Sequence, residues 1–278
     1  MSDPVTVSIV VPTYNRPAFL AEALRSLAGQ TYRAFEAIVV NDAGADVQPV
    51  IREFAAAMAV VYREHPANRG LAAARNTALA AAQGRYIAYL DDDDRYYPDH
   101  LQTLVGFLQQ NPGRVAYTDA VRACERQTGS SRTLVRREPA PAFDFDRDRL
   151  LLGNYIPVLC VMHEKSCLDA VGGFDESLSS HEDWDLWIRM AQRFPFAHIP
   201  EVTAEISWRE DGTTMTSGHR ADMLRTTRII YRKHAALVQD RPDLRAAQRA
   251  NVRKTALSRI VRSVPGLSSV RHRPERPG

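Results

Sequence analysis

Residues 84–94 read Gly-Arg-Tyr-Ile-Ala-Tyr-Leu-Asp-Asp-Asp-Asp, a short apolar run that ends in four consecutive carboxylates. We expect Tyr86 to Leu90 to form a buried strand, because the run is continuously apolar and follows a glycine that closes a helix. Four adjacent carboxylates repel one another, and a divalent cation relieves that repulsion. Hard oxygen ligands favour Mg²⁺ or Mn²⁺, which bridge a carboxylate to substrate phosphates. The alternative is a polar turn that caps the next helix, and one or two of the four could serve in that way.

The segments before this run alternate between strands and helices. Residues 7–11 and 37–40 are apolar runs that predict buried strands, and residues 60–62 predict a third, short strand. Apolar residues at helical spacing predict a helix after the first strand and another from Gly70 to about Ala82. Such alternation predicts an α/β fold, a mostly parallel sheet flanked by helices.

Polar residues follow three of the predicted strands. Pro12 and Tyr14 come after the first strand, Asp42 after the second, and Asp91 to Asp94 after the fourth. Ligands of open parallel sheets bind at the carboxyl ends of the strands. We therefore expect these side chains to converge on one crevice. Taken alone, Asp42 could equally be the polar first residue of a turn.

Two further motifs carry charged residues into predicted helices. Arg75 lies one turn into the helix that begins at Gly70, where an arginine can contact a phosphate or a base, or simply face solvent. Glu182 and Asp183 begin a helix in the second half, where a carboxylate often only complements the helix dipole. A diphosphate site also needs a general base for the incoming hydroxyl, and nearby tryptophans would raise the pKa of such a carboxylate.

Composition and length indicate a globular protein. The chain has 278 residues, of which 45% are hydrophobic and 25% are charged. No apolar run approaches the roughly 20 residues of a membrane helix, and the N-terminus does not resemble a secretory signal. We therefore expect a cytoplasmic location. The three cysteines form no close-spaced metal pair, so we expect reduced thiols.

The charge is distributed unevenly. From Arg220 to Gly278 there are 15 Lys and Arg residues against 4 Asp and Glu residues. A basic segment of this kind indicates an anionic partner. Nucleic acid is not expected, because no aromatic ring other than histidine follows Tyr231. We expect a peripheral contact with an anionic membrane, and a solvated helix with a frayed end is the alternative.

Taken together, the motifs resemble those of the inverting family 2 glycosyltransferases of the GT-A fold, of the bacterial type that builds surface polysaccharides. Their order and spacing match the family from about residue 5 to residue 195. Processive members carry a Gln-x-x-Arg-Trp motif and membrane helices, which the sequence lacks, so a polymer synthase is not expected. The matching segments are Val7–Arg16, Gln30–Tyr32, Ile38–Asp42, Asn68–Asn76, Gly84–Asp94, Gly172–Glu176 and Glu182–Asp185.

The resemblance implies a donor site at matching positions. Pro12 and Tyr14 would lie beside the nucleoside, with Tyr14 stacked on the base and Asp42 at the base edge. Arg75 would contact the base or the diphosphate, and Asp92 would lie near the ribose. The nucleotide would be uridine or thymidine in preference to guanosine.

The resemblance also implies the metal ligand and the catalytic base. Asp93 would ligate Mn²⁺ or Mg²⁺, and Asp91 completes the Asp-x-Asp pattern. Asp183 matches the family's base, with Glu182 as its neighbour and less favoured alternative. The implied activity is transfer of a sugar from a UDP- or dTDP-sugar to a glycan or lipid-linked acceptor. A sugar nucleotidyltransferase and a non-catalytic nucleotide-sugar binding module are the alternatives.

We expect two domains. Residues 1–218 would form the GT-A domain, with a nucleotide-binding half at 1–115 and an acceptor half at 116–218. Residues 219–278 would form a basic helical extension with a disordered tail. The second half is less regular in sequence, and residues 158–162 predict a further strand.

Overall fold

The computed structural model describes residues 6–128, 131–209 and 220–263. The chain forms two compact units, Met1–Thr214 and Met215–Gly278. The domain boundary expected at residues 218 and 219 lies outside the described residues.

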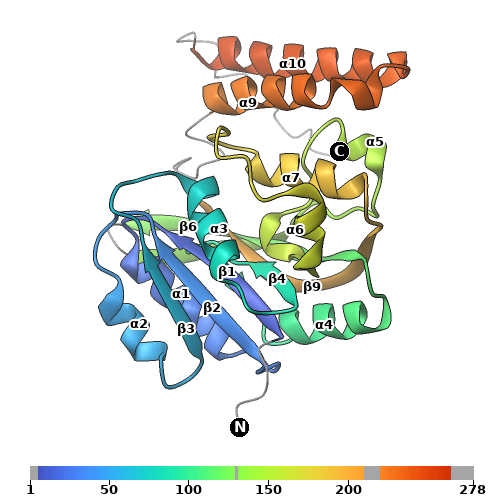
Figure 1. Cartoon of the computed structure of the whole chain (residues 1–278). Helices are drawn as coiled ribbons and strands as arrows, with labels where there is room; N and C mark the ends of the chain where they lie inside the picture. The colour runs from blue at the N-terminus through green and yellow to red at the C-terminus, as the bar shows by residue number, and fades with distance from the viewer. Residues whose placement is uncertain (1–5, 129–130, 210–219, 264–278) are drawn as a thin grey trace, which may run out of the picture. The chain divides into compact units, whose positions relative to one another are not determined.

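A mixed sheet forms the centre of the first unit (Figure 1). Its first half is parallel, with the strand order β3-β2-β1-β4, as the alternation of strands and helices predicts. The antiparallel strand β8 follows β4 and pairs in turn with β6, which is parallel to β9. The strands are β1 (Val7–Thr13), β2 (Phe35–Asn41), β3 (Ala59–Glu64), β4 (Tyr86–Tyr89), β5 (Arg95–Tyr96), β6 (Val115–Thr128), β7 (Ser131–Pro139), β8 (Val161–Glu164) and β9 (Phe196–Arg209).

The pattern of burial follows from the position of each strand. Strands β1, β2 and β4 are buried along their whole length, because they lie in the interior of the sheet with helices against it. Strand β3 lies at the edge and is largely half-buried or exposed. The continuous apolar runs of the sequence therefore mark interior strands.

Helices cover the parallel half of the sheet. Helix α3 packs on β1 and β2, and Figure 1 shows it lying across the face of the sheet. Helix α1 begins with a proline in its first turn and buries a stripe of apolar residues that includes Leu20, Leu24 and Leu27. The helices of this unit are α1 (Pro17–Ala28), α2 (Gln48–Phe54), α3 (Leu71–Ala81), α4 (His100–Gln110), α5 (Arg147–Leu150), α6 (Ser166–Val171) and α7 (Glu182–Ala191), with the 3₁₀ turn η1 (Val158–Cys160).

The second unit is helical. Helix α9 (Arg220–Lys233), the 3₁₀ turn η2 (Ala235–Val238) and helix α10 (Pro242–Ser263) pack against one another. Among the described residues, no helix has the length and apolar character needed to cross a membrane. The α/β class with a helical C-terminal extension is thus confirmed.

Candidate active site

The four carboxylates after β4 lie on one tight turn that points them in different directions. The main-chain N–H of Asp94 donates to the carbonyl of Asp91 at 3.1 Å and closes the turn. The Asp94 carboxylate is buried and accepts the main-chain N–H of Ser207 on β9 at 2.9 Å. Asp94 therefore ties the turn to β9, and the other three carboxylates face different partners.

Asp92 is held against the end of β1. Its carboxylate accepts the hydroxyl of Thr13 at 2.8 Å and Nη1 of Arg16 at 3.1 Å. Burial, together with the negative charge of Asp93, raises the pKa of Asp92 to about 7, and Arg16 opposes this shift. A carboxyl that titrates near neutrality is uncommon and marks the turn as a candidate functional site.

Asp93 is the more accessible of these two carboxylates, with a side chain 23% exposed. Its Oδ2 accepts Nη1 of Arg16 at 2.9 Å and Nη2 of Arg209 at 3.0 Å, while its main-chain carbonyl accepts Nη1 of Arg132 at 3.1 Å. Burial raises the pKa of Asp93, and the neighbouring guanidinium groups lower it. Two arginines thus bind the carboxylate of Asp93, and a third binds its main-chain carbonyl.

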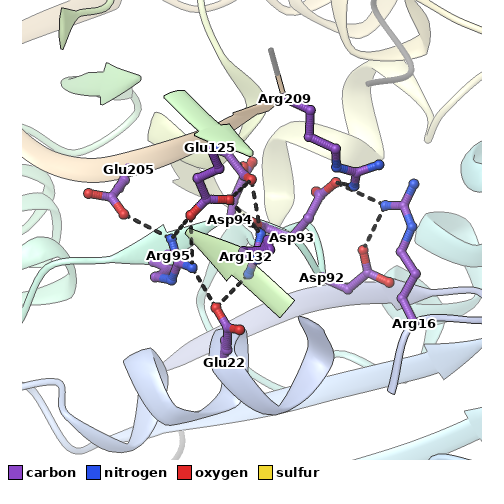
Figure 2. A network of polar contacts seen from close by, with 11 residues as sticks. Arg16, Glu22, Asp92, Asp93, Asp94, Arg95, Glu125, Arg132, Glu205 and Arg209 are labelled. Carbon is purple, nitrogen blue, oxygen red and sulfur yellow. Dashed lines mark hydrogen bonds and ion pairs between the residues drawn. The ribbon is translucent and has the colours of Figure 1, made fainter. Parts of the chain in front are cut away.

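A buried ionic network supports the turn from below (Figure 2). Arg132 on β7 is only 3% exposed and donates to Glu22 on α1 and to Ser207 on β9. Arg95, directly after the carboxylates, makes ion pairs with three carboxylates that come from separate elements. A buried charge needs such partners, so the network fixes the main chain on which Asp93 sits. The three partners of Arg95 are Glu22, Glu125 and Glu205.

Arg75 links the carboxylate turn to α7. The side chain is buried, which rules out the alternative of a surface arginine, and Nη2 donates to Asp91 at 2.7 Å. Nη1 donates to Glu182, and the guanidinium lies over the ring of Phe174, 5.4 Å from its centroid. Asn76 fixes this ring by donating to the carbonyl of Phe174 and accepting its N–H. The neighbouring carboxylates raise the pKa of Arg75 against the effect of burial, so its charge is permanent.

Asp183 lies beside Glu182 in the first turn of α7. Its Oδ2 accepts Nδ2 of Asn154 at 2.7 Å, and its Oδ1 accepts the N–H of Trp184 at 2.7 Å. Burial raises the pKa of both Asp183 and Glu182, and the charge of Arg75 lowers them. The net effect raises the pKa of both carboxyl groups, which makes each carboxylate a stronger proton acceptor.

The carboxylate of Asp42 binds the main chain of the loop before α3. Its Oδ1 accepts the N–H of Arg69 at 2.8 Å, and its Oδ2 accepts the N–H of Gly70 at 2.7 Å. A third hydrogen bond joins Oδ1 to Nδ1 of His65 at 2.6 Å. Gly70 has a φ of +91°, which a residue with a Cβ rarely adopts. Asp42 therefore anchors this turn, and a role at a base edge would use its remaining acceptor capacity.

Pro12 and Tyr14, which are predicted to lie beside the nucleoside, differ in exposure. Pro12 is buried within β1, whereas the ring of Tyr14 is 47% exposed in the loop that follows. Asn15, next in this loop, has a φ of +58° and accepts the N–H of Ala45 at 2.9 Å. An exposed ring on a fixed loop can stack on a planar ligand.

The contacts join residues from four separate segments. They connect Asp92 to Thr13 and Asp91, through Arg75, to Glu182. No role was predicted from the sequence for Arg16, Asn154 or Arg132. Only Arg16 carried a local signal, since it directly follows the Pro12 to Asn15 motif.

The carboxylates of the turn suit a divalent cation that binds together with a substrate phosphate. Within the described residues, no group of three or more His, Cys, Asp or Glu side chains is arranged to hold a metal. Mg²⁺ and Mn²⁺ are commonly held by one or two carboxylates together with substrate phosphates and water. Asp93, with Asp91 beside it, matches this donor chemistry.

Comparison with known proteins identifies the family. The model of glycosyl transferase family 2 matches residues 8–167. The uncharacterized glycosyltransferase YwdF of Bacillus subtilis is 30% identical over 213 residues, which cover 76% of this chain and 77% of YwdF. The uncharacterized protein y4gI of Sinorhizobium fredii is 33% identical over 223 residues, which are 77% of this chain but 23% of that protein.

Solved structures share the fold. S. aureus TarS in complex with UDP-GlcNAc superposes with a TM-score of 0.61 at 21% identity, over 81% of this chain and 65% of that one. The mannosyltransferase PcManGT from Pyrobaculum calidifontis, in complex with GDP-Man and Mn²⁺, gives a TM-score of 0.60 at 19% identity, over 95% of this chain and 77% of that one. With the matched family model and the relative in B. subtilis, this identifies the chain as a member of glycosyl transferase family 2, an inverting glycosyltransferase of the GT-A fold.

Proposed function

We propose that this glycosyltransferase moves a sugar from a UDP- or dTDP-sugar to a hydroxyl of a glycan or lipid-linked acceptor, in the biosynthesis of a surface polysaccharide or related glycan. The observation that carries the proposal is the contact between Asp91, Arg75 and Glu182. It couples the carboxylate turn to the start of α7, where the candidate base lies. Donor diphosphate and incoming hydroxyl would then meet between these two groups.

The donor nucleotide would lie at the ends of β1, β2 and β4. The exposed ring of Tyr14 would stack on the base, beside Pro12, and Asp42 would accept a base N–H while anchoring its turn. Asp92 would face the ribose. TarS and PcManGT are seen with uridine and guanosine nucleotides respectively, so the fold alone does not select the base.

Asp93, with Asp91, would hold Mn²⁺ or Mg²⁺ against the diphosphate. When bound, the ion supplies positive charge for the leaving group. Arg75 would fix the positions of Asp91 and Glu182 relative to each other through its two ion pairs. It would also add a permanent positive charge near the diphosphate. A direct contact of Arg75 with the base or diphosphate stays a prediction.

Asp183 would act as the general base. The hydrogen bonds from Asn154 and from the N–H of Trp184 fix both of its oxygens, so the carboxylate meets the acceptor hydroxyl in one orientation. Asp183 takes the proton as the hydroxyl oxygen bonds to the anomeric carbon and the bond to the nucleoside diphosphate breaks. Attack on the face opposite the leaving group inverts the anomeric centre. Glu182 is committed to Arg75, which favours Asp183 over Glu182 as the base.

The second unit supports a partner proposal. A groove of about 550 Å³ is lined by apolar parts of Tyr231, Val238 and Val252 and by three arginines of α10. The arginines are Arg245, Arg249 and Arg253, spaced one helical turn apart. We propose that residues 219–278 contact an anionic membrane at its cytoplasmic face, where a lipid-linked acceptor would be presented to a catalytic domain of residues 1–218.

Ligand-dependent stability tests the donor site. We would measure Tm with UDP, TDP, GDP and CDP, each with and without Mn²⁺. One nucleotide should give a metal-dependent rise of ~2.7 kcal/mol in the free energy of unfolding at a hundredfold excess over Kd. Asp93→Ala should abolish the rise, whereas Asp99→Ala, an exposed carboxylate nearby, should keep it. No rise with any nucleotide would contradict the proposed donor site.

A further inference from the structure

Two guanidinium groups meet on the oxygen of the proposed metal ligand. Arg16 lies in the loop after β1, and Arg209 is the last residue of β9. Their Nη atoms lie 2.9 and 3.0 Å from the same atom, Oδ2 of Asp93. Figure 2 shows the two side chains reaching Asp93 from different elements. This oxygen therefore already has two cationic partners.

The arrangement is held on a rigid support. Arg132 binds the main-chain carbonyl of Asp93 and lies over the ring of Phe19, 4.2 Å from its centroid. Arg209 lies over the same ring at 5.4 Å and is only 7% exposed. Arg16 is more accessible, at 29%. Asp93 is thus fixed from the backbone side, while Arg16, which also donates to Asp92, is the more accessible of its two guanidinium partners.

A divalent cation and these arginines have the same sign of charge and need the same carboxylate. A cation on Asp93 would lie within a few ångströms of two guanidinium groups, in a partly buried place where repulsion is weakly screened. A nucleoside diphosphate changes this balance, because its oxygens accept guanidinium hydrogen bonds in the geometry that arginine prefers.

We propose that Arg16 and Arg209 form a guanidinium latch on Asp93, which the donor diphosphate opens. The guanidinium groups turn from Asp93 to the diphosphate oxygens, and Asp93 becomes available to the cation. Metal and nucleotide then bind cooperatively, each raising the affinity for the other by the same factor. This inference rests on the proposed function, since it assigns the diphosphate and the cation to this turn.

Binding of Mn²⁺ alone separates the latch from a supporting role. We would measure it in wild type and Arg16→Gln from the electron paramagnetic resonance signal of free Mn²⁺. Removing one positive charge beside Asp93 should tighten Mn²⁺ binding about three- to tenfold. Affinity for the nucleoside diphosphate, measured by calorimetry with Mn²⁺, should fall about tenfold with the loss of a charge-assisted hydrogen bond. The variant therefore moves the two affinities in opposite directions.

Three further variants complete the design. Arg209→Gln should act in the same direction, and Arg16→Lys, which keeps the charge, should bind Mn²⁺ nearly as wild type does. Arg85→Gln removes an exposed arginine that pairs with Glu164 at the other end of β4, and should change neither affinity. Circular dichroism of each variant confirms folding, and Arg16→Gln decides the result if the more buried Arg209→Gln does not fold.

Each result has a defined meaning. Mn²⁺ binding that is equal or weaker in Arg16→Gln would overturn the latch, because the arginine would then support Asp93 and not compete with the cation. Failure of wild type to bind UDP, TDP, GDP or CDP with Mn²⁺ would contradict the proposed function instead. The Mn²⁺ measurement needs no nucleotide, so the two failures are distinguishable.

Discussion

The four aspartates of residues 91–94 have identical side chains but different partners, because each side chain leaves the turn in a different direction. Asp94 binds the main chain of β9, and Asp91 binds Arg75. Asp92 and Asp93 share Arg16 but differ in exposure. Asp94 therefore has a structural role, although it binds β9 and does not cap the next helix, and the metal site predicted for this run would draw on the other carboxylates.

The raised pKa of Asp92 predicts that the stability of the fold depends on pH. Its folded pKa of about 7 lies above its ordinary value of 3.8, so the folded protein binds the proton more tightly. The contribution of this proton to the free energy of unfolding is greatest below about pH 4 and is lost as the pH rises through 7. Between these limits the free energy of unfolding should fall by up to ~1.4 kcal/mol per pH unit. Denaturation in EDTA at pH 5–8 should show this slope, and Asp92→Asn should reduce it, leaving the part that comes from neighbouring carboxyl groups with raised pKa values. An unchanged slope in the variant would assign the titration to another group.

Asp183 predicts a loss of turnover without a loss of donor binding. Asp183→Asn should lower kcat roughly 10²- to 10⁴-fold, because the amide cannot accept the proton. Affinity for the nucleotide with Mn²⁺ should stay within about twofold, which calorimetry can measure. Equal loss of both would show that Asp183 helps to bind the donor.

Asn154 predicts a shift in the pH profile of the reaction. Its hydrogen bond to Oδ2 favours the ionised form of Asp183 and lowers its pKa. Asn154→Ala should therefore raise this pKa and move the acid limb of kcat to higher pH. Donor affinity at pH 8 is the control and should not change. A uniform drop in kcat at every pH would instead indicate misplacement of the base.

At the scale of elements, the β6–β7 hairpin matters because it brings Arg132 beneath the carboxylate turn. Arg132→Met should lower the free energy of unfolding by about 3–5 kcal/mol, since the buried Glu125 loses a partner. Arg137→Gln, on the same strand but half exposed, should cost less than about 1 kcal/mol. Urea denaturation compares the two. A small effect of Arg132→Met would show that the network tolerates the loss by rearranging.

The elements differ in how well the sequence predicted them. Largely apolar runs located β1, β2 and β4, because burial on both faces favours apolar residues, and the buried Ser8 of β1 and Glu36 of β2 hydrogen-bond to each other. The strand expected at residues 158–162 was partly wrong, since residues 158–160 form a 3₁₀ turn and β8 begins at Val161. An apolar run reports burial and does not by itself fix the backbone conformation.

The arginines of β7 and β9 that contact the carboxylate turn could not be predicted from the sequence, for a different reason. Arg132 and Arg209 lie 39 and 116 residues from Asp93 in the chain. Such pairs depend on strand pairing between distant segments, which no local pattern encodes. The motifs at the ends of strands were predictable because each lies beside its own apolar run. The arginines on β7 and β9 have no comparable local context.

At the scale of the whole molecule, the excess of basic residues from Arg220 to Gly278 predicts binding to anionic membranes. The arginines Arg245, Arg249 and Arg253 are exposed beside an apolar groove of the second unit. Such a surface suits lipid phosphates, with apolar side chains beside them.

Replacing these three arginines by glutamine should weaken binding to vesicles with 30% anionic lipid by about a hundredfold at low salt. A matched triple of Arg25, Arg52 and Arg63 to glutamine removes the same charge from exposed positions of the first unit. If the stripe on α10 is the contact, only the first triple loses binding in a vesicle sedimentation assay, and raising the salt removes the difference. Equal losses would mean that net charge alone attracts the protein, because the position of the charge would then not matter. Unchanged binding in the first triple would exclude the stripe as a membrane contact, and the acceptor would have to reach the enzyme by another route.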